Sequence, residues 1–394
     1  MGKVVSRNFE EEAMAVDTAV NFTGIKFENP FLLSSAPPTE SENNIKRAFD
    51  AGWAGVVVKT IGLHPVVNVY GARTKFVRTT PETNQISMKK RPGAALHSSW
   101  NWELISDQPL DWWLPVIRRL KASHPHKVLI ASIMAGSGSD KELAAWQELA
   151  IGCQDAGADG VELNFSCPHM DRKDMGSNIG KDEGLCSTVT EAVKEAARIP
   201  VWCKLTPSTT DIVLEAAACF RGGADAIVSS NTFPALPPID PESLEFEINV
   251  DGLVSSGGMG GPAILPLSMA KMAQMTSAFP DRSFSGIGGV SDFSQAVNYF
   301  LLGCGTVQVC TAAMLDSAVG PNVIKRLLSG LTEFIEKHAD KGWTRVEDFR
   351  GIRRDRIVLQ SQIRRPDKAD YRGGYAEEIE GYAAPEEVTA VPGD

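Results

Sequence analysis

The sequence predicts an α/β protein built as a (β/α)8 barrel, with an N-terminal β-hairpin and long loops on the active face. Eight short apolar runs recur along the chain, and stretches with helical periodicity separate them. Runs that are apolar throughout suit parallel strands that are covered on both faces. A doubly wound sheet is the alternative, but it usually carries a glycine-rich fingerprint after its first strand, and here that strand runs into Ser34-Ser35-Ala36-Pro37.

The expected strands follow one another with helix patterns between them. In chain order they span 31–35, 55–60, 127–133, 158–164, 200–205, 224–230, 283–289 and 305–310. The helix patterns at 41–52, 141–157 and 210–223 end in glycine, which is a frequent C-terminal stop signal. Residues 21–31 precede the first strand and read as a hairpin that closes the bottom of the barrel.

Two long interruptions break the repeat. The segment 64–109 separates the second strand from its helix, and the segment 233–262 follows the sixth strand. Loops of this length in a compact domain usually serve binding, and in a barrel the loops after the strands line the active face. We therefore expect both segments to border the site.

The ends of the chain differ in character from the barrel. We expect an N-terminal extension over 1–19, the barrel over 20–350 and a polar C-terminal extension over 351–394. Seven arginines lie between 350 and 372, at the start of this last segment, and an acidic tail follows them. A solvated extension and a docking arm for another subunit therefore remain alternatives. The N-terminus lacks the apolar region of a secretory signal.

Composition narrows the class of protein. The chain is 43% hydrophobic and 22% charged, which is typical of a globular protein. A net charge of −10 argues against nucleic acid as a partner, and no apolar run approaches the ~18 residues of a membrane span. These features together predict a cytoplasmic protein.

The seven cysteines include no C-x-x-C pair. This spacing argues against zinc and against a ferredoxin-type iron–sulfur cluster on this chain, and no metal site is expected. Most of the cysteines fall inside predicted strands or helices, where a thiol is commonly a small buried hydrophobe. Cys167 instead follows the fourth strand directly, in a run that also holds Asn164 and His169.

Polar and small residues gather at the predicted strand ends, where barrel active sites lie. They are Ser35, Ala36, Lys59, Thr60, Asn164, Cys167, Lys204, Asn231, Thr232, Gly288, Gly289, Cys310 and Thr311. Asn101 adds an amide from the first long loop. A lysine that ends an apolar strand is costly to bury without a partner. A single lysine at such a position can place its ammonium group in solvent at the rim of the barrel. Two lysines, Lys59 and Lys204, beside asparagines instead indicate a ligand site.

Glycines late in the chain indicate a phosphorylated ligand. Barrel phosphate sites often use the loops after strands seven and eight, where this chain has Gly288-Gly289 and Cys310-Thr311. Gly258, in the second long loop, adds a further backbone amide. A glycine pair also serves a tight turn, so the pattern as a whole carries the prediction.

The sequence resembles the dihydroorotate dehydrogenase-like FMN barrels. Within that family it is most similar to the pyrimidine-reducing enzymes of the dihydropyrimidine dehydrogenase type. The resemblance covers roughly residues 20 to 350. It rests on NPF (29–31), VVVKTIG (56–62), NWELIS (101–106), KVLIASIM (127–134), NFSCPH (164–169), KLTP (204–207), SNT (230–232), GIGGV (286–290) and VQVC (307–310).

The resemblance implies a role for each site residue. Cys167 is expected as the proton donor or acceptor at C5 of a uracil- or thymine-like ring, while FMN N5 exchanges hydride with C6. The expected contacts to that ring come from Asn101, Asn164, Asn231, Thr232 and His169, and this histidine favours uracil or thymine over orotate. Lys59 and Lys204 would lie against the isoalloxazine. Ser35, Ala36 and Thr60 would also hold FMN, and its phosphate and ribityl end would lie against Gly258, Gly288, Gly289, Cys310 and Thr311.

The chemistry agrees with that assignment. An asparagine can pair with an imide through donor and acceptor together, and a thiol titrates in the range that suits proton transfer at C5. A dihydroorotate dehydrogenase, or an FMN ene-reductase acting on another cyclic imide, is the alternative. A catalytically silent barrel subunit would lack the yellow chromophore, and a phosphate-sugar isomerase would bind no flavin.

The electron source is the point at which the chain departs from the pattern. The pyrimidine-reducing relatives pass electrons through iron–sulfur clusters, but this sequence has no cysteine after Cys310. The candidates are a partner subunit, a free ferredoxin and NAD(P)H, which would act directly or through a partner. A homodimer or a hetero-oligomer is the default expectation for such barrels.

Overall fold

The computed structural model describes residues 16–69, 71, 73–80, 85–90, 93–167 and 172–364. Residues up to Arg354 form one compact unit, and those from Asp355 onward form a second. Within the second unit the described residues include a short turn, in which the Leu359 N–H donates to Gln362 Oε1 at 2.9 Å. Much of both predicted extensions therefore lies outside the described residues.

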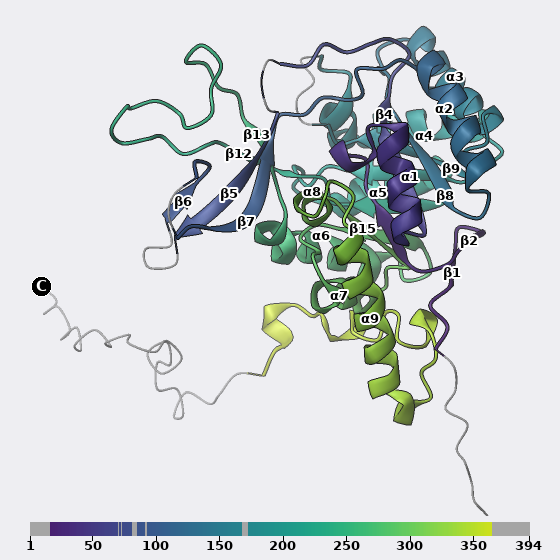
Figure 1. Cartoon of the computed structure of the whole chain (residues 1–394). Helices are drawn as coiled ribbons and strands as arrows, with labels where there is room; N and C mark the ends of the chain where they lie inside the picture. The colour runs from purple at the N-terminus through teal and green to yellow at the C-terminus, as the bar shows by residue number, and fades with distance from the viewer. Residues whose placement is uncertain are drawn as a thin grey trace, which may run out of the picture. The chain divides into compact units, whose positions relative to one another are not determined.

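Eight parallel strands close into a barrel, as predicted (Figure 1). Around the ring, in chain order, lie β3 (Phe31–Leu33), β4 (Gly55–Ile61), β8 (Val128–Ile133), β9 (Gly160–Phe165), β10 (Val201–Leu205), β11 (Ala226–Ser229), β14 (Ser283–Ile287) and β15 (Thr306–Val309), and β15 pairs back with β3. Every residue of β4, β8 and β9 is buried, which explains the continuous apolar runs.

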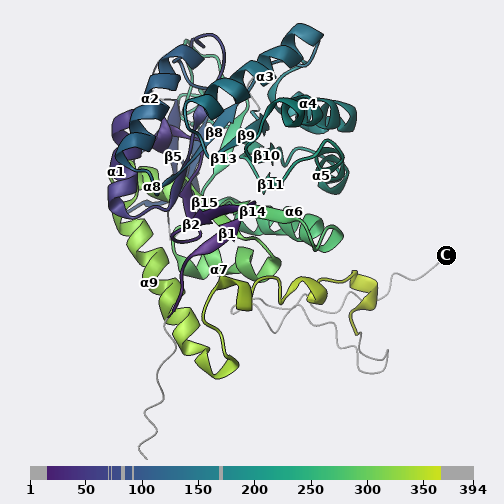
Figure 2. The ribbon, with the colours of Figure 1, turned by 90° about the vertical axis from the view of Figure 1, so that its right-hand side faces the viewer.

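Helices cover the outside of the strands, and Figure 2 shows α3 to α6 following one another around them. The helices are α1 (Glu42–Ala51), α2 (Leu110–Ser123), α3 (Asp140–Asp155), α4 (Glu183–Ala196), α5 (Ile212–Arg221), α6 (Leu265–Ala278), α7 (Phe293–Leu302), α8 (Thr311–Leu315) and α9 (Pro321–Lys337). The longer helices bury apolar residues against the barrel, as α1 does with Ile45, Ala48 and Phe49. Gly52 ends α1 with φ of 113°, which favours glycine.

Short 3-10 helices lie in the connections between these elements and after α9. They are η1 (Pro37–Thr39), η2 (Gly176–Lys181), η3 (Pro262–Ile264), η4 (Ala339–Lys341), η5 (Val346–Asp348), η6 (Arg354–Arg356) and η7 (Gln360–Gln362). In the part of the chain that the structure describes, no helix is long and apolar enough to cross a membrane.

The predicted hairpin lies at the N-terminal end of the barrel strands. Strands β1 (Val20–Phe22) and β2 (Ile25–Phe27) pair antiparallel around Thr23. The Phe22 ring packs edge-on against Trp202 near the start of β10, with centroids 5.1 Å apart, and Trp202 Nε1 donates to Thr23 Oγ1 at 3.0 Å. The hairpin thus covers the bottom of the barrel, opposite the strand ends that carry the site.

The two long interruptions form one antiparallel sheet beside the barrel, at the left of Figure 1. Its order is β12 (Phe233–Ala235), β13 (Gly257–Gly260), β7 (Ala95–Asn101), β5 (Thr74–Thr80) and β6 (Gln85–Ser87). Trp100 and Trp102 pack with centroids 5.2 Å apart in a small core of its own. The segments predicted as long loops therefore contain strands, because each supplies a pairing edge to the other.

Candidate active site

A cavity opens at the C-terminal ends of the barrel strands. It encloses about 970 Å³ of empty space, part of it open to solvent, within the range of about 300–1,000 Å³ typical of cofactor sites. The predicted site residues that line it are Ser35, Ala36, Lys59, Thr60, Asn101, Asn164, Cys167, Lys204, Asn231, Thr232, Gly288, Gly289, Cys310 and Thr311. Residues from almost every strand end thus meet in one space, as barrel topology requires.

Two predicted site residues are not among those lining residues. His169 lies outside the described residues. Gly258 lies in β13 behind Thr232, where an added Cβ would come within 2.1 Å of Thr232 Oγ1. Its carbonyl accepts a hydrogen bond from Asn101 Nδ2 at 3.2 Å. Gly258 therefore links two predicted substrate-binding residues, and Gly260 and Gly261 line the cavity beyond it.

Hydrogen bonds join the amides of the site into a chain. Asn231 Nδ2 donates to Ser166 Oγ at 2.8 Å, Ser166 Oγ donates to Asn164 Oδ1 at 2.9 Å, and Asn164 Nδ2 donates to Thr60 Oγ1 at 2.9 Å. Thr60 also contacts Ser35 Oγ at 3.1 Å. Because each amide is held by a neighbour, the side chains are oriented before a ligand arrives.

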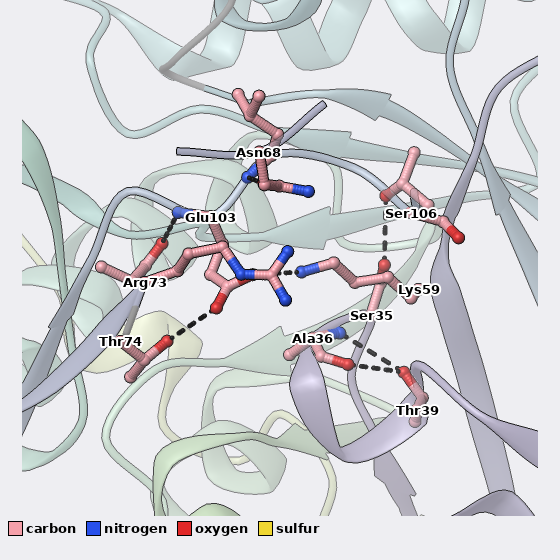
Figure 3. A network of polar contacts seen from close by, with 12 residues as sticks. Ser35, Ala36, Thr39, Lys59, Asn68, Arg73, Thr74, Glu103 and Ser106 are labelled. Carbon is pink, nitrogen blue, oxygen red and sulfur yellow. Dashed lines mark hydrogen bonds and ion pairs between the residues drawn. The ribbon is translucent and has the colours of Figure 1, made fainter. Parts of the chain in front are cut away.

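Lys59 is paired with a carboxylate that also lines the cavity (Figure 3). Its Nζ lies 3.0 Å from Glu103 Oε2, and the two side chains are only 7% and 12% exposed. Thr74 Oγ1 donates to Glu103 Oε1 at 3.1 Å, and Arg73 Nε lies 3.7 Å from Oε2. Burial makes this pair stronger than a surface ion pair.

Lys204 points into the barrel above a second buried carboxylate. Its Nζ lies 3.7 Å from Oε1 of Glu162, a side chain with no exposed surface. Glu162 Oε2 accepts a hydrogen bond from Gln308 Nε2 at 2.9 Å. Glu162 and Asn164 share a face of β9 because side chains alternate along a strand. The carboxylate thus supports Lys204 from the barrel interior.

Small residues and hydroxyls form another wall. Gly261, Gly288 and Gly289 have φ of 85°, 124° and 82°, values that favour glycine. An added Cβ at Gly288 would come within 2.3 Å of Ser268 Oγ. Thr311 Oγ1 contacts Ser99 Oγ at 2.8 Å. A wall of backbone and hydroxyl groups fits a phosphorylated cofactor, because such a group approaches main-chain donors closely only where side chains are absent.

The two cysteines of the cavity lie in different surroundings. Cys167 follows β9 next to the amide chain, and its carbonyl accepts a hydrogen bond from the Ser177 N–H at 2.9 Å. Cys310 follows β15, and its Sγ lies 3.6 Å from Met314 Sδ. Burial raises the pKa of the Cys310 thiol, and the nearby Lys204 only partly opposes this. Both thiols thus border the cavity, and Cys310 packs against Met314.

Sequence reasoning missed the carboxylates that pair with the lysines. Glu103 lies two residues beyond Asn101 in an irregular segment, and no local pattern marks it. Glu162 had a signal, since a charged residue within an apolar strand needs a buried partner. Basic side chains of the 64–109 segment also flank the site in sequence, but Lys75, Arg78, Lys89 and Lys90 are not among the residues that line the cavity.

Comparison with known proteins gives the family. The family model described as dihydroorotate dehydrogenase matches residues 110–335. The chain is 35% identical to the chloroplastic dihydropyrimidine dehydrogenase (NADP(+)) of Arabidopsis thaliana over 91% of this chain and 83% of that protein. The chain belongs to the dihydroorotate dehydrogenase family. Enzymes of this family are FMN-dependent oxidoreductases.

Other relatives of this dihydroorotate dehydrogenase family member are named as subunits. The NAD-dependent dihydropyrimidine dehydrogenase subunit PreA of Escherichia coli K12 is 36% identical over 89% of this chain and 80% of its own. The catalytic subunit of dihydroorotate dehydrogenase B (NAD(+)) of Petrotoga mobilis is 27% identical over 86% and 99%. The predicted family and barrel are thus confirmed.

Proposed function

We propose that this protein interconverts a uracil- or thymine-like pyrimidine and its 5,6-dihydro form with the help of FMN. The proposal depends on one observation: a single cavity is lined by three asparagine amides, by a cysteine beside them and by a wall of glycines. The relatives in A. thaliana and E. coli that are named dihydropyrimidine dehydrogenases support the same reaction.

The residues present fit FMN. Gly288, Gly289 and Thr311 would hold its phosphate end, and Lys59 and Lys204 would lie against its ring. Ser35, Ala36, Thr60 and Cys310 line the same space and complete the proposed cofactor contacts. Bound FMN supplies the hydride that is exchanged at C6 of the pyrimidine.

The remaining roles belong to the chain's own side chains. Asn101, Asn164 and Asn231 offer amide donors and acceptors to the imide edge and carbonyls of the ring, with Thr232 beside them. Cys167 Sγ gives a proton to C5 in the reducing direction and takes it back in the other. General acid catalysis of this kind contributes about 10²- to 10⁴-fold.

The variant Cys167→Ser tests this role. We expect it to bind FMN and uracil but to exchange hydride with the pyrimidine about 10²- to 10⁴-fold more slowly in single-turnover experiments, because a hydroxyl is a far weaker acid than a thiol. Cys153→Ala is the matched control, since this cysteine is buried in α3 away from the cavity, and it should react at the wild-type rate. An unchanged rate in Cys167→Ser would remove Cys167 from the mechanism.

Substrate identity is tested directly with the purified protein. The flavin spectrum is followed anaerobically while dihydrouracil, dihydrothymine or dihydroorotate is added. Bleaching by dihydrouracil or dihydrothymine supports the proposal, and bleaching by dihydroorotate alone favours the alternative of a dihydroorotate dehydrogenase. A colourless protein that takes up no FMN would overturn both.

The electron partner is proposed to be another protein. The relatives in E. coli and P. mobilis are named as subunits, which supports an assembly in which a partner subunit or a ferredoxin exchanges electrons with NAD(P)H. For residues 351–394, a docking arm for such a partner and a solvated extension remain the two alternatives. A homodimer that turns over at full rate with NAD(P)H alone would contradict this proposal.

A further inference from the structure

Charge balance within the cavity bears on substrate choice. Among its described lining residues the basic side chains are Lys59 and Lys204, and each has a carboxylate within 4 Å. Glu103 faces the first and Glu162 the second. The cavity wall therefore offers a substrate no described lysine that lacks an acidic partner.

Glu103 differs from Glu162 in its access to the ligand. Glu162 has no exposed surface, whereas Glu103 is 12% exposed and lines the cavity together with Asn101 and Asn164. Its carboxylate is held in place by Lys59, Thr74 and Arg73 (Figure 3). An ion-paired carboxylate therefore stands at the wall of the cavity.

Further charged groups surround this ion pair. Burial raises the pKa of Glu40, and four charged neighbours act on it as well: Lys59 and Arg73 lower that pKa, and Glu103 and Asp107 raise it. The local set thus holds three acids and two bases. An added anion would meet two cations that both already lie within 4 Å of the Glu103 carboxylate.

We propose that Glu103 is a specificity-determining residue, whose ion-paired carboxylate admits uncharged pyrimidine rings and excludes rings that bear a carboxylate. This inference rests on the proposed function and narrows it. Orotate is uracil with an added carboxylate, so the two ligands differ in the group that would meet Glu103. Like charges placed together in a binding site act against the unwanted ligand.

The test compares the affinities of uracil and orotate for the oxidised holoenzyme by titration calorimetry, so the readout does not depend on turnover. Wild type should bind uracil at least tenfold more tightly than orotate. Glu103→Gln keeps the shape and an oxygen acceptor for Lys59 and Thr74 but removes the charge. We expect orotate to bind this variant at least tenfold more tightly than wild type, while uracil changes less than threefold.

Two matched variants complete the design. Glu103→Asp keeps the charge and should keep the preference for uracil. Glu40→Gln removes a carboxylate of the same set that does not line the cavity, and it should leave the ratio of the two affinities unchanged.

The outcomes separate this inference from the proposed function. If wild type binds orotate as tightly as uracil, Glu103 does not select and the inference fails while pyrimidine binding stands. An equal change of both affinities in Glu103→Gln would mean that Glu103 only positions Lys59, and an equal effect of Glu40→Gln would assign selection to the whole acidic set. If wild type binds neither ligand, the proposed function fails and this inference falls with it.

Discussion

Replacing Lys204 with methionine tests how much its buried ion pair with Glu162 contributes to stability. Methionine fills a similar volume and carries no charge. In Lys204→Met the carboxylate of Glu162 keeps its hydrogen bond from Gln308 Nε2 but loses the ammonium 3.7 Å from Oε1. Because Glu162 has no exposed surface, water does not replace that ammonium without a change in the structure.

The magnitude follows from the geometry. Two unit charges about 3.7 Å apart attract by about 4.5 kcal/mol at an effective dielectric constant of about 20. Removing one partner of a buried pair typically costs about 3–5 kcal/mol, because the other charge stays buried. We therefore expect Lys204→Met to lower the free energy of unfolding by about 3–5 kcal/mol.

Urea unfolding followed by circular dichroism measures this cost. The double variant Glu162→Gln/Lys204→Met should recover at least about 2 kcal/mol, because it leaves no unpaired charge. Lys194→Met is the control: Lys194 pairs with Asp225 at 2.8 Å, but both side chains are about a third exposed, so it should cost at most about 1 kcal/mol. A cost below about 1 kcal/mol for Lys204→Met, or additive single and double variants, would refute the reasoning.

Two further predictions concern the glycine wall and Glu40. Gly288→Ala should lower FMN affinity at least about tenfold, as measured by flavin release on dialysis, because the methyl group would press on Ser268 at a backbone φ of 124°; retention equal to wild type would contradict this. Glu40→Gln should raise the urea midpoint at pH 7. Folding raises the pKa of Glu40 above 4.5, so the folded protein loses stability as the pH rises from 4.5 through the pKa of the folded state, and a glutamine does not ionise. The gain should vanish below about pH 4.5, where both states are protonated, and a gain that persists there would have another cause.

The local pattern predicts the barrel well. Parallel strands covered on both faces need apolar residues at every position, and the predicted runs agree with β3, β4 and β8 within two residues at either end. The cavity follows from the same topology, since the strand ends meet at one rim. That is why a position such as Thr60 could be assigned to the site before any contact was known.

Contacts between residues far apart in the sequence could not be predicted from local sequence patterns. Glu103 reaches Lys59 across 44 positions of the chain, and Gly258 meets Asn101 across 157. Gly258 shows the limit clearly, because local sequence does not reveal its contacts with Asn101 and Thr232. Such pairing depends on which strand edges meet, here those of β7 and β13, and the sequence of either segment alone does not specify its partner.

The sequence by itself determined the strands, the order of the barrel and the identity of the chemical groups at its rim, because these depend on periodicity and on the direction of parallel strands. Only the tertiary structure decided how the charged side chains of the cavity are paired. The energy of a buried lysine depends on the carboxylate beside it. Pairing of β9 with β10 brings Glu162 to Lys204, and the chain that follows β7 brings Glu103 to Lys59.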